Sequence, residues 1–144
     1  MVRVRKSVII ARPLVEVFDF VADPRREPLW RTAVTSMAHE GGSASGVGAR
    51  YRMTGSYEGR SGDAVLTCTE YVRNERVSYS GGEGPVAAGF TYQVRSDGAS
   101  TVVAMVVKAD IKGPAAAFSG MAEKMLDKMA DADLHKLKRI LEKA

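Results

Sequence analysis

The sequence predicts an α+β fold in which a curved antiparallel sheet of about seven strands packs against a long C-terminal helix, with two short helices after the first strand. Three observations predict it. Apolar residues alternate with polar ones before residue 12 and again between residues 34 and 111, glycine-rich turns divide the second region, and helix-forming residues fill the last thirty positions. With 144 residues, we expect positions 1–144 to form one domain with its own core.

The first strand is expected from Arg3 to Ala11, where β-branched residues dominate. Arg12-Pro13 breaks this strand, and proline suits the first position of a helix. Apolar side chains then recur at helical spacing, which predicts a short amphipathic helix from Pro13 to Ala22. Asp23-Pro24 ends it and begins a brief second helix that leads to Trp30, the only tryptophan.

A meander of short strands follows, because period-two segments are separated by turn signals such as Gly41-Gly42, Gly81 to Pro85 and Asp97-Gly98. We place its strands at Val34 to Glu40, Ala49 to Tyr57, Asp63 to Tyr71, Arg76 to Gly81, Gly89 to Arg95 and Thr101 to Ile111. One face of this sheet is apolar and aromatic by alternation, and the other is polar.

The last segment, Pro114 to Lys143, reads as one helix because it is rich in Ala, Met, Leu, Lys and Glu, with Gly120 as its weak point. At 1.5 Å per residue it would be about 45 Å long. Its apolar stripe and the apolar sheet face are both buried if the helix lies in the concavity of the sheet.

Composition narrows the function classes. The net charge of +4 is concentrated near the N-terminus, and its cations alternate with carboxylates rather than with aromatic residues, so no nucleic-acid partner is expected. Cys68 is the single cysteine, which excludes an internal disulfide and favours a reducing, cytoplasmic location. His39 and His135 have no metal-ligand spacing, and no phosphate-loop or dinucleotide motif occurs, so neither a metal nor a cofactor is expected. No apolar run is long enough to insert stably into a membrane.

Several segments carry a family resemblance. The run from Ser7 to Pro24, followed by Pro28-Leu29-Trp30, resembles the opening of the START-like (SRPBCC, helix-grip) superfamily, which holds polyketide cyclases and dehydrases, lipid-transfer domains and Bet v 1-like proteins. Thr69 to Tyr71, the hairpin from Asp97 to Val103 and the closing Asp133 to Glu142 are similar to that group too. The resemblance covers essentially the whole chain and implies the helix-grip fold.

The resemblance also implies an apolar cavity between the concave face and the last helix, occupied by a hydrophobic small molecule. Alternation along the strands and the helix supplies its expected lining, which consists of Trp30, Tyr51, Met53, Leu66, Cys68, Phe90, Tyr92, Met105, Met121 and Met125. The same pattern is also typical of a solid core.

Three functional hypotheses stay open. The first is a binding protein or carrier for a polyketide, lipid or quinone-like ligand. The second is a polyketide cyclase or dehydratase, with Glu70 and Tyr92 as acid–base candidates, since strand parity turns Glu70 inward with Leu66 and Cys68. The third is a protein-interaction module that uses the Met-rich helix face or the basic N-terminal rim. The chain is expected to be a monomer or a homodimer.

Overall fold

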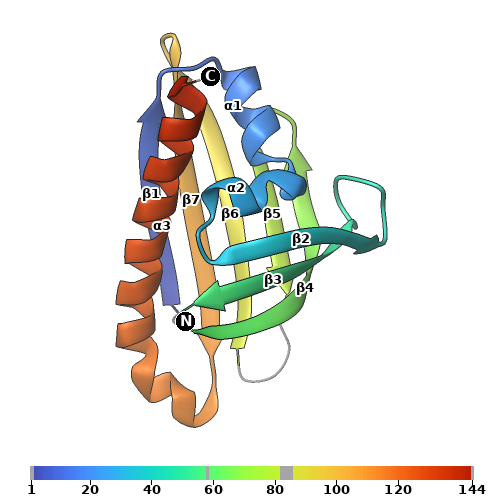
Figure 1. Cartoon of the computed structure of the whole chain (residues 1–144), viewed down its shortest axis with the longest axis vertical. Helices are drawn as coiled ribbons and strands as arrows, with labels where there is room; N and C mark the ends of the chain where they lie inside the picture. The colour runs from blue at the N-terminus through green and yellow to red at the C-terminus, as the bar shows by residue number, and fades with distance from the viewer. Residues whose placement is uncertain (1, 58, 82–85, 144) are drawn as a thin grey trace.

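The computed structural model describes residues 2–57, 59–81 and 86–143. Within them, seven strands form one antiparallel sheet in the order β1-β7-β6-β5-β4-β3-β2 (Figure 1). The strands are β1 Val2–Ile10, β2 Val34–Gly41, β3 Arg50–Tyr57, β4 Arg60–Val72, β5 Arg76–Gly81, β6 Val86–Asp97 and β7 Ser100–Ile111. The predicted antiparallel sheet of about seven strands is confirmed, whereas the turn expected at 82–85 lies outside the described residues.

Two short helical segments connect β1 to β2, as predicted. Helix α1 spans Leu14–Val21, and the 3-10 turn η1 (Pro24–Arg26) leads directly into α2 (Glu27–Trp30). The Asp23 carboxylate accepts a hydrogen bond from the Arg25 backbone N–H and so caps η1. These segments lie in front of the strongly curved sheet in Figure 1.

The composition predicts one continuous helix from Pro114, but the C-terminal segment contains two helical elements. A 3-10 turn, η2 (Gly113–Phe118), comes first, and α3 then spans Ser119–Lys143. The Ser119 hydroxyl donates to the Ala116 carbonyl at 2.7 Å, so serine at this junction favours a local turn over a continuing helix.

Helix α3 runs beside the edge strand β1 (Figure 1). Lys6 and Asp127 form an ion pair at 3.4 Å, and Glu142 accepts the Ala11 backbone N–H at 2.8 Å. The buried apolar side chains of α3 lie from its middle to its C-terminus and are Ala130, Leu134, Leu137 and Leu141, and Leu126 packs partly buried against the same core.

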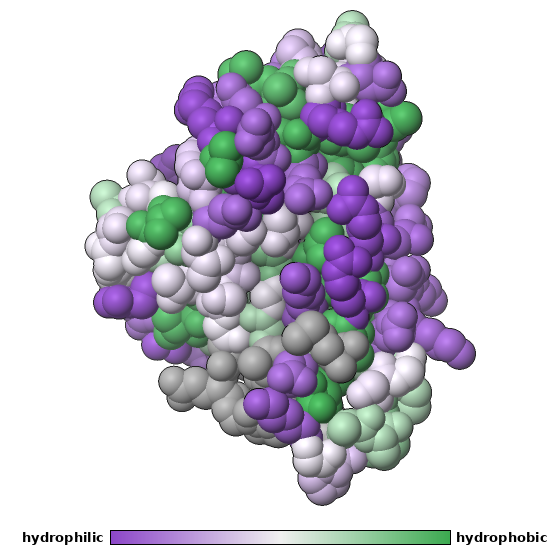
Figure 2. Space-filling model, turned by 180° about the vertical axis from the view of Figure 1, so that it is seen from behind, coloured by the Kyte–Doolittle hydropathy of each residue, from purple (hydrophilic) through white to green (hydrophobic). Residues whose placement is uncertain are grey.

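The two sheet faces differ as alternation predicts. On the concave side, Tyr79, Phe90, Tyr92 and Met105 are buried in the core. The opposite side, seen in Figure 2, carries many polar side chains with apolar patches between them. A β-bulge in β4 interrupts the alternation: Cys68 pairs with Tyr79 and Glu70 pairs with Ser78, which leaves Thr69 as an extra residue.

The bulge overturns the prediction that Glu70 points inward. The extra residue shifts the parity of β4, so Glu70 lies on the outer face with Ser78. There its side chain is 43% exposed and its carboxylate forms an ion pair with Arg76 at 2.8 Å.

Candidate functional site

A pocket of about 890 Å³ opens on the concave side of the sheet. Its walls come from the end of α1, η1, strand β2, the loop after β2, and the inner faces of β3, β4 and β5. The lining residues are Asp19, Ala22, Asp23, Pro24, Arg25, Met37, Ala38, His39, Ala44, Ser45, Gly46, Tyr51, Cys68, Tyr71 and Tyr79. None of these residues belongs to α3, so the cavity lies beside the short helices rather than under the terminal helix.

Three tyrosines dominate the walls. Tyr51 and Tyr79 are buried and stack edge to face, with ring centroids 6.2 Å apart, and Tyr71 packs against Phe18 in the same manner. None of the hydroxyls of Tyr51, Tyr71 and Tyr79 forms a hydrogen bond with the described part of the chain. Burial raises the pKa of Tyr51 and of Tyr79, so both phenols stay protonated and remain donors at neutral pH.

The pocket mouth carries charges that are already paired. Asp23 accepts hydrogen bonds from the backbone N–H and Nε of Arg25 at 3.0 and 3.1 Å, and its second oxygen contacts Nη2 at 3.1 Å. Burial alone would raise the pKa of the Asp23 carboxyl, but the bonds and charge of Arg25 outweigh it and lower that pKa. Arg25 is the only lysine or arginine of the lining, so the pocket offers no unpaired ammonium or guanidinium group among its described residues.

His39 and Cys68 complete the reactive side chains of the pocket. His39 Nε2 lies 2.8 Å from the Ser43 carbonyl, which makes Nε2 the donor, and its ring meets Tyr51 edge-on. The Cys68 thiol donates weakly to the Glu70 carbonyl at 3.4 Å. Burial raises the pKa of this thiol, which makes it a poor nucleophile.

The loop after β2 forms one wall because glycine permits its backbone. Gly42 has a φ of +70°, and an added Cβ would lie 2.0 Å from the Gly48 carbonyl oxygen. Gly48 N–H in turn donates to Cys68 O at 2.9 Å. The loop is therefore tied to the strand that carries the pocket thiol.

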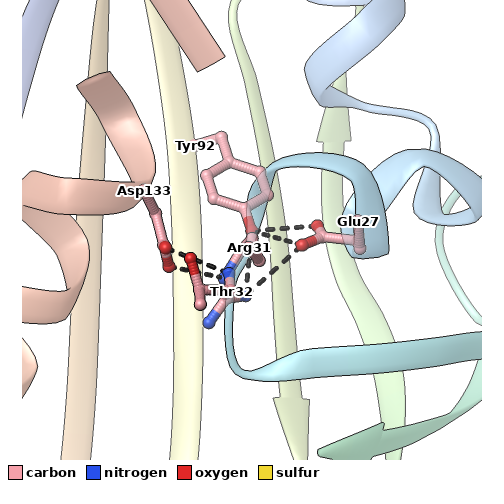
Figure 3. A network of polar contacts seen from close by, with 5 residues as sticks. All are labelled: Glu27, Arg31, Thr32, Tyr92 and Asp133. Carbon is pink, nitrogen blue, oxygen red and sulfur yellow. Dashed lines mark hydrogen bonds and ion pairs between the residues drawn. The ribbon is translucent and has the colours of Figure 1, made fainter. Parts of the chain in front are cut away.

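A second group of polar side chains lies deeper, between α2, β6 and α3 (Figure 3). The Tyr92 hydroxyl donates to both carboxylate oxygens of Glu27, at 2.9 and 3.0 Å. Arg31 Nη1 donates to the Tyr92 oxygen at 3.0 Å and to Glu27 at 3.4 Å. Asp133 accepts the Thr32 backbone N–H at 3.1 Å, which joins α3 to this network.

Burial dominates the electrostatics of this network. It raises the pKa of the Glu27 carboxyl more than Arg31 and Tyr92 lower it, and it keeps the pKa of Tyr92 well above its ordinary value. Arg31 remains charged, with its guanidinium 4.7 Å from the centre of the Phe90 ring. The network is packed shut, because Glu27, Tyr92 and Asp133 are each at most 3% exposed.

The predicted lining residues fall into three groups. Tyr51 and Cys68 lie on the pocket wall. Buried in the core away from the pocket are Trp30, Leu66, Phe90, Tyr92 and Met105, with Met53 partly buried beside them. Met121 and Met125 are 71% and 38% exposed, so the prediction that they face inward is wrong, since the buried residues of α3 begin only at Ala130.

Sequence reasoning missed most of the pocket and, apart from Tyr92, the network. Tyr79 shares a face with Val77 in a predicted strand, so parity alone could have found it. Tyr71 is turned into the pocket by the bulge, which leaves no signal in the alternation. Glu27 and Arg31 are four residues apart on a short helical segment, a spacing that permits an ion pair but does not reveal burial.

No group of three or more His, Cys, Asp or Glu side chains that could hold a metal ion occurs among the described residues. Nor does any helix in those residues have the length and hydrophobicity that a membrane span requires.

A curved sheet that grips a C-terminal helix, with a cavity on its concave side, defines a START-like protein of the helix-grip class. The chain belongs to the family described as "Polyketide cyclase / dehydrase and lipid transport", whose model matches residues 1–142. No curated protein matches the chain.

Solved structures share the fold at low sequence identity. Protein TTHA0849 from Thermus thermophilus superposes with a TM-score of 0.80 at 17% identity, over 95% of this chain and 94% of that one. The di-domain ARO/CYC BexL from the BE-7585A biosynthetic pathway also gives 0.80 at 18% identity, over 99% of this chain and 47% of BexL. A START superfamily protein from Mycobacterium smegmatis gives 0.73 at 19% identity, over 97% and 94% of the two chains.

Proposed function

We propose that this chain binds a neutral, hydrophobic aromatic molecule that bears several oxygen atoms, of the polyketide or quinone type, in the pocket of about 890 Å³. That volume lies within the range of small-molecule sites. The observation that carries the proposal is the set of three pocket tyrosines, Tyr51, Tyr71 and Tyr79, whose hydroxyls have no hydrogen-bond partner within the described residues.

The hydroxyls favour an oxygenated ligand because each lines the pocket as a donor that no described residue accepts, so a ligand that fills the pocket must supply the acceptors when it displaces water. Carbonyl or hydroxyl oxygens on a planar ring system would accept from the phenols while the tyrosine rings pack against its faces. A saturated alkyl chain would fill the volume but leave all three donors unsatisfied.

The charged side chains at the pocket mouth favour the binding of neutral ligands over that of fatty acids. A carboxylate needs a cation, and Arg25 is already bound to Asp23 through three contacts. Asp19 and Asp23 add negative charge to the lining. An anionic lipid is therefore disfavoured relative to a neutral aromatic of similar size.

The test is a binding measurement with two probes, a dihydroxyanthraquinone and palmitate, together with native mass spectrometry of the gently purified protein. We expect the anthraquinone to bind and to raise Tm, and Tyr79→Phe to weaken it about fivefold to tenfold through loss of one hydrogen bond. Tyr92→Phe is the matched control, because its hydroxyl faces Glu27 and not the pocket. A protein that purifies empty and responds to neither probe contradicts the proposal.

The alternative of a cyclase or dehydratase lacks its proposed residues at the pocket. Glu70 is on the outer face, and the Tyr92 hydroxyl is bound by Glu27 and Arg31. We therefore propose a carrier or binding role for residues 1–144 as one domain. The single cysteine supports a reducing, cytoplasmic setting.

A further inference from the structure

One end of the molecule exposes large apolar side chains. Phe118, Met121 and Met125 are 63%, 71% and 38% exposed, at the end of η2 and in the first two turns of α3. Their spacing of three and four residues places Met121 and Met125 on one side of the helix. In water this arrangement is unfavourable, because apolar side chains of this size gain free energy when they are covered.

Exposed lysines flank these side chains on the helix, since Lys124 and Lys128 each follow a methionine, Met121 and Met125, by three residues. Arg3 pairs in register with Lys108 at the start of β1 and the end of β7, on the outer face of the sheet, because the alternate residues Val4 and Val107 face the core. The exposed cations of this region are Arg3, Lys108, Lys112, Lys124 and Lys128. Among the described residues, only Lys112 of these five forms an ion pair, with Asp110 at 3.8 Å. We call this end, with Phe118, Met121 and Met125, the basic pole.

We propose that the basic pole docks on an anionic lipid surface. The three apolar side chains enter the boundary between headgroups and acyl chains, and the cations contact lipid phosphates, which is the combination that holds amphipathic segments on membranes. The contact is peripheral. It is separate from ligand binding, because no residue of the basic pole lines the pocket.

Charge and size favour a membrane over other occupants. A second copy would bring the same unpaired cations face to face, which costs free energy. A stable protein partner buries about 800 Å² on each side, more than three side chains supply. Long methionine side chains and flexible lysines suit a fluid lipid surface, since neither needs a fixed complementary shape.

The test is sedimentation of the whole chain, without added ligand, with vesicles of phosphatidylcholine alone and of phosphatidylcholine with about one third phosphatidylglycerol. We expect binding to the anionic vesicles only, and a loss of binding when salt rises from about 0.1 to about 0.5 M. The double variant Phe118→Ser/Met121→Ser should reduce the bound fraction about fivefold or more. The double variant Lys124→Glu/Lys128→Glu should reduce the bound fraction to a similar extent.

Val15→Ser and Leu29→Ser are the matched controls, because these side chains are 50% and 54% exposed on α1 and α2, away from the basic pole, and should bind like the parent chain. Circular dichroism checks that each variant folds. The proposal is overturned if the parent chain ignores anionic vesicles, or if the basic-pole variants bind as well as the controls. It is also overturned if light scattering shows a dimer that Met121→Ser dissociates, since a second copy would then cover this surface.

Discussion

The concave face of the sheet has two halves built from the same kinds of residue. In the packed half, Trp30, Phe90 and Tyr92 are in contact, and the one phenol there donates to Glu27. In the pocket half, Tyr51 and Tyr79 also pack against each other, yet their hydroxyls meet no protein acceptor in the described residues. Aromatic content therefore does not distinguish core from cavity. The difference lies in the phenols: the chain supplies an acceptor for the hydroxyl of Tyr92 and none, among the described residues, for those of Tyr51 and Tyr79, although Trp30 Nε1 and Arg31 Nε in the packed half also lack hydrogen-bond partners there.

The largest expected effect comes from removing the carboxylate of the packed half. Glu27→Ala leaves the mostly buried Arg31 guanidinium with only the longer ion pair to Asp133, at 3.9 Å, and we expect the free energy of unfolding to fall by about 3 kcal/mol. Urea denaturation followed by circular dichroism measures it. Glu123→Ala, at an exposed position of α3, is the control and should stay within about 0.5 kcal/mol of the parent. A similarly small change for Glu27→Ala would show that the packed half does not depend on its ion pair.

A matched pair of substitutions compares the halves directly. Tyr92→Phe removes a donor from buried Glu27 and should cost about 1–3 kcal/mol of stability. Tyr79→Phe removes an unpaired hydroxyl and should change stability by less than about 0.5 kcal/mol. Ligand affinity should fall for Tyr79→Phe and stay close to that of the parent chain for Tyr92→Phe. Equal losses of stability from the two variants would remove the distinction between the halves.

The pH dependence of stability gives a finer test. Because burial raises the pKa of Glu27 in the folded state, the unfolded chain loses this proton first as pH rises above the ordinary value of 4.5. The contribution of Glu27 to stability is thus complete below that pH and declines as pH rises through the folded pKa. Urea titrations across this range should show the decline in the parent chain and its absence in Glu27→Gln. If the free energy of unfolding falls with pH in Glu27→Gln as it does in the parent chain, the decline does not come from Glu27.

The smallest expected effect is on the pocket thiol. Cys68 has a raised pKa and is 1% exposed, so a disulfide reagent should react with it at least about tenfold more slowly than with the urea-unfolded chain. A bound anthraquinone should slow the reaction further, without a change in the far-ultraviolet spectrum. Reaction at the unfolded rate would place the thiol outside the closed wall.

Local pattern predicted the fold well and the site poorly, for a physical reason. Strand alternation and turn glycines depend on near neighbours, so the seven strands and the two short helices follow from the sequence. The ion pair of Arg31 with Glu27 depends instead on burial by β6 and α3, which lie more than sixty residues away in the chain. Met121 and Met125 continue the apolar stripe of α3 but are exposed, and a stripe does not reveal which of its turns the sheet covers.

The bulge at Thr69 has a consequence for how this pocket can change. Cys68 and Tyr71 are three residues apart, a spacing that would put them on opposite faces of a regular strand, yet both reach the same cavity. The pocket wall thus depends on the bulge as well as on the residue types of β4. Deleting Thr69 would leave a regular ladder that keeps the pairs Glu70–Ser78 and Tyr71–Val77, so the Tyr71 phenol would still face the cavity. The same residues paired without the bulge would instead turn the Glu70 carboxylate into the cavity and the Tyr71 phenol to solvent, so one unpaired threonine decides whether this part of the wall is a neutral donor or an acid.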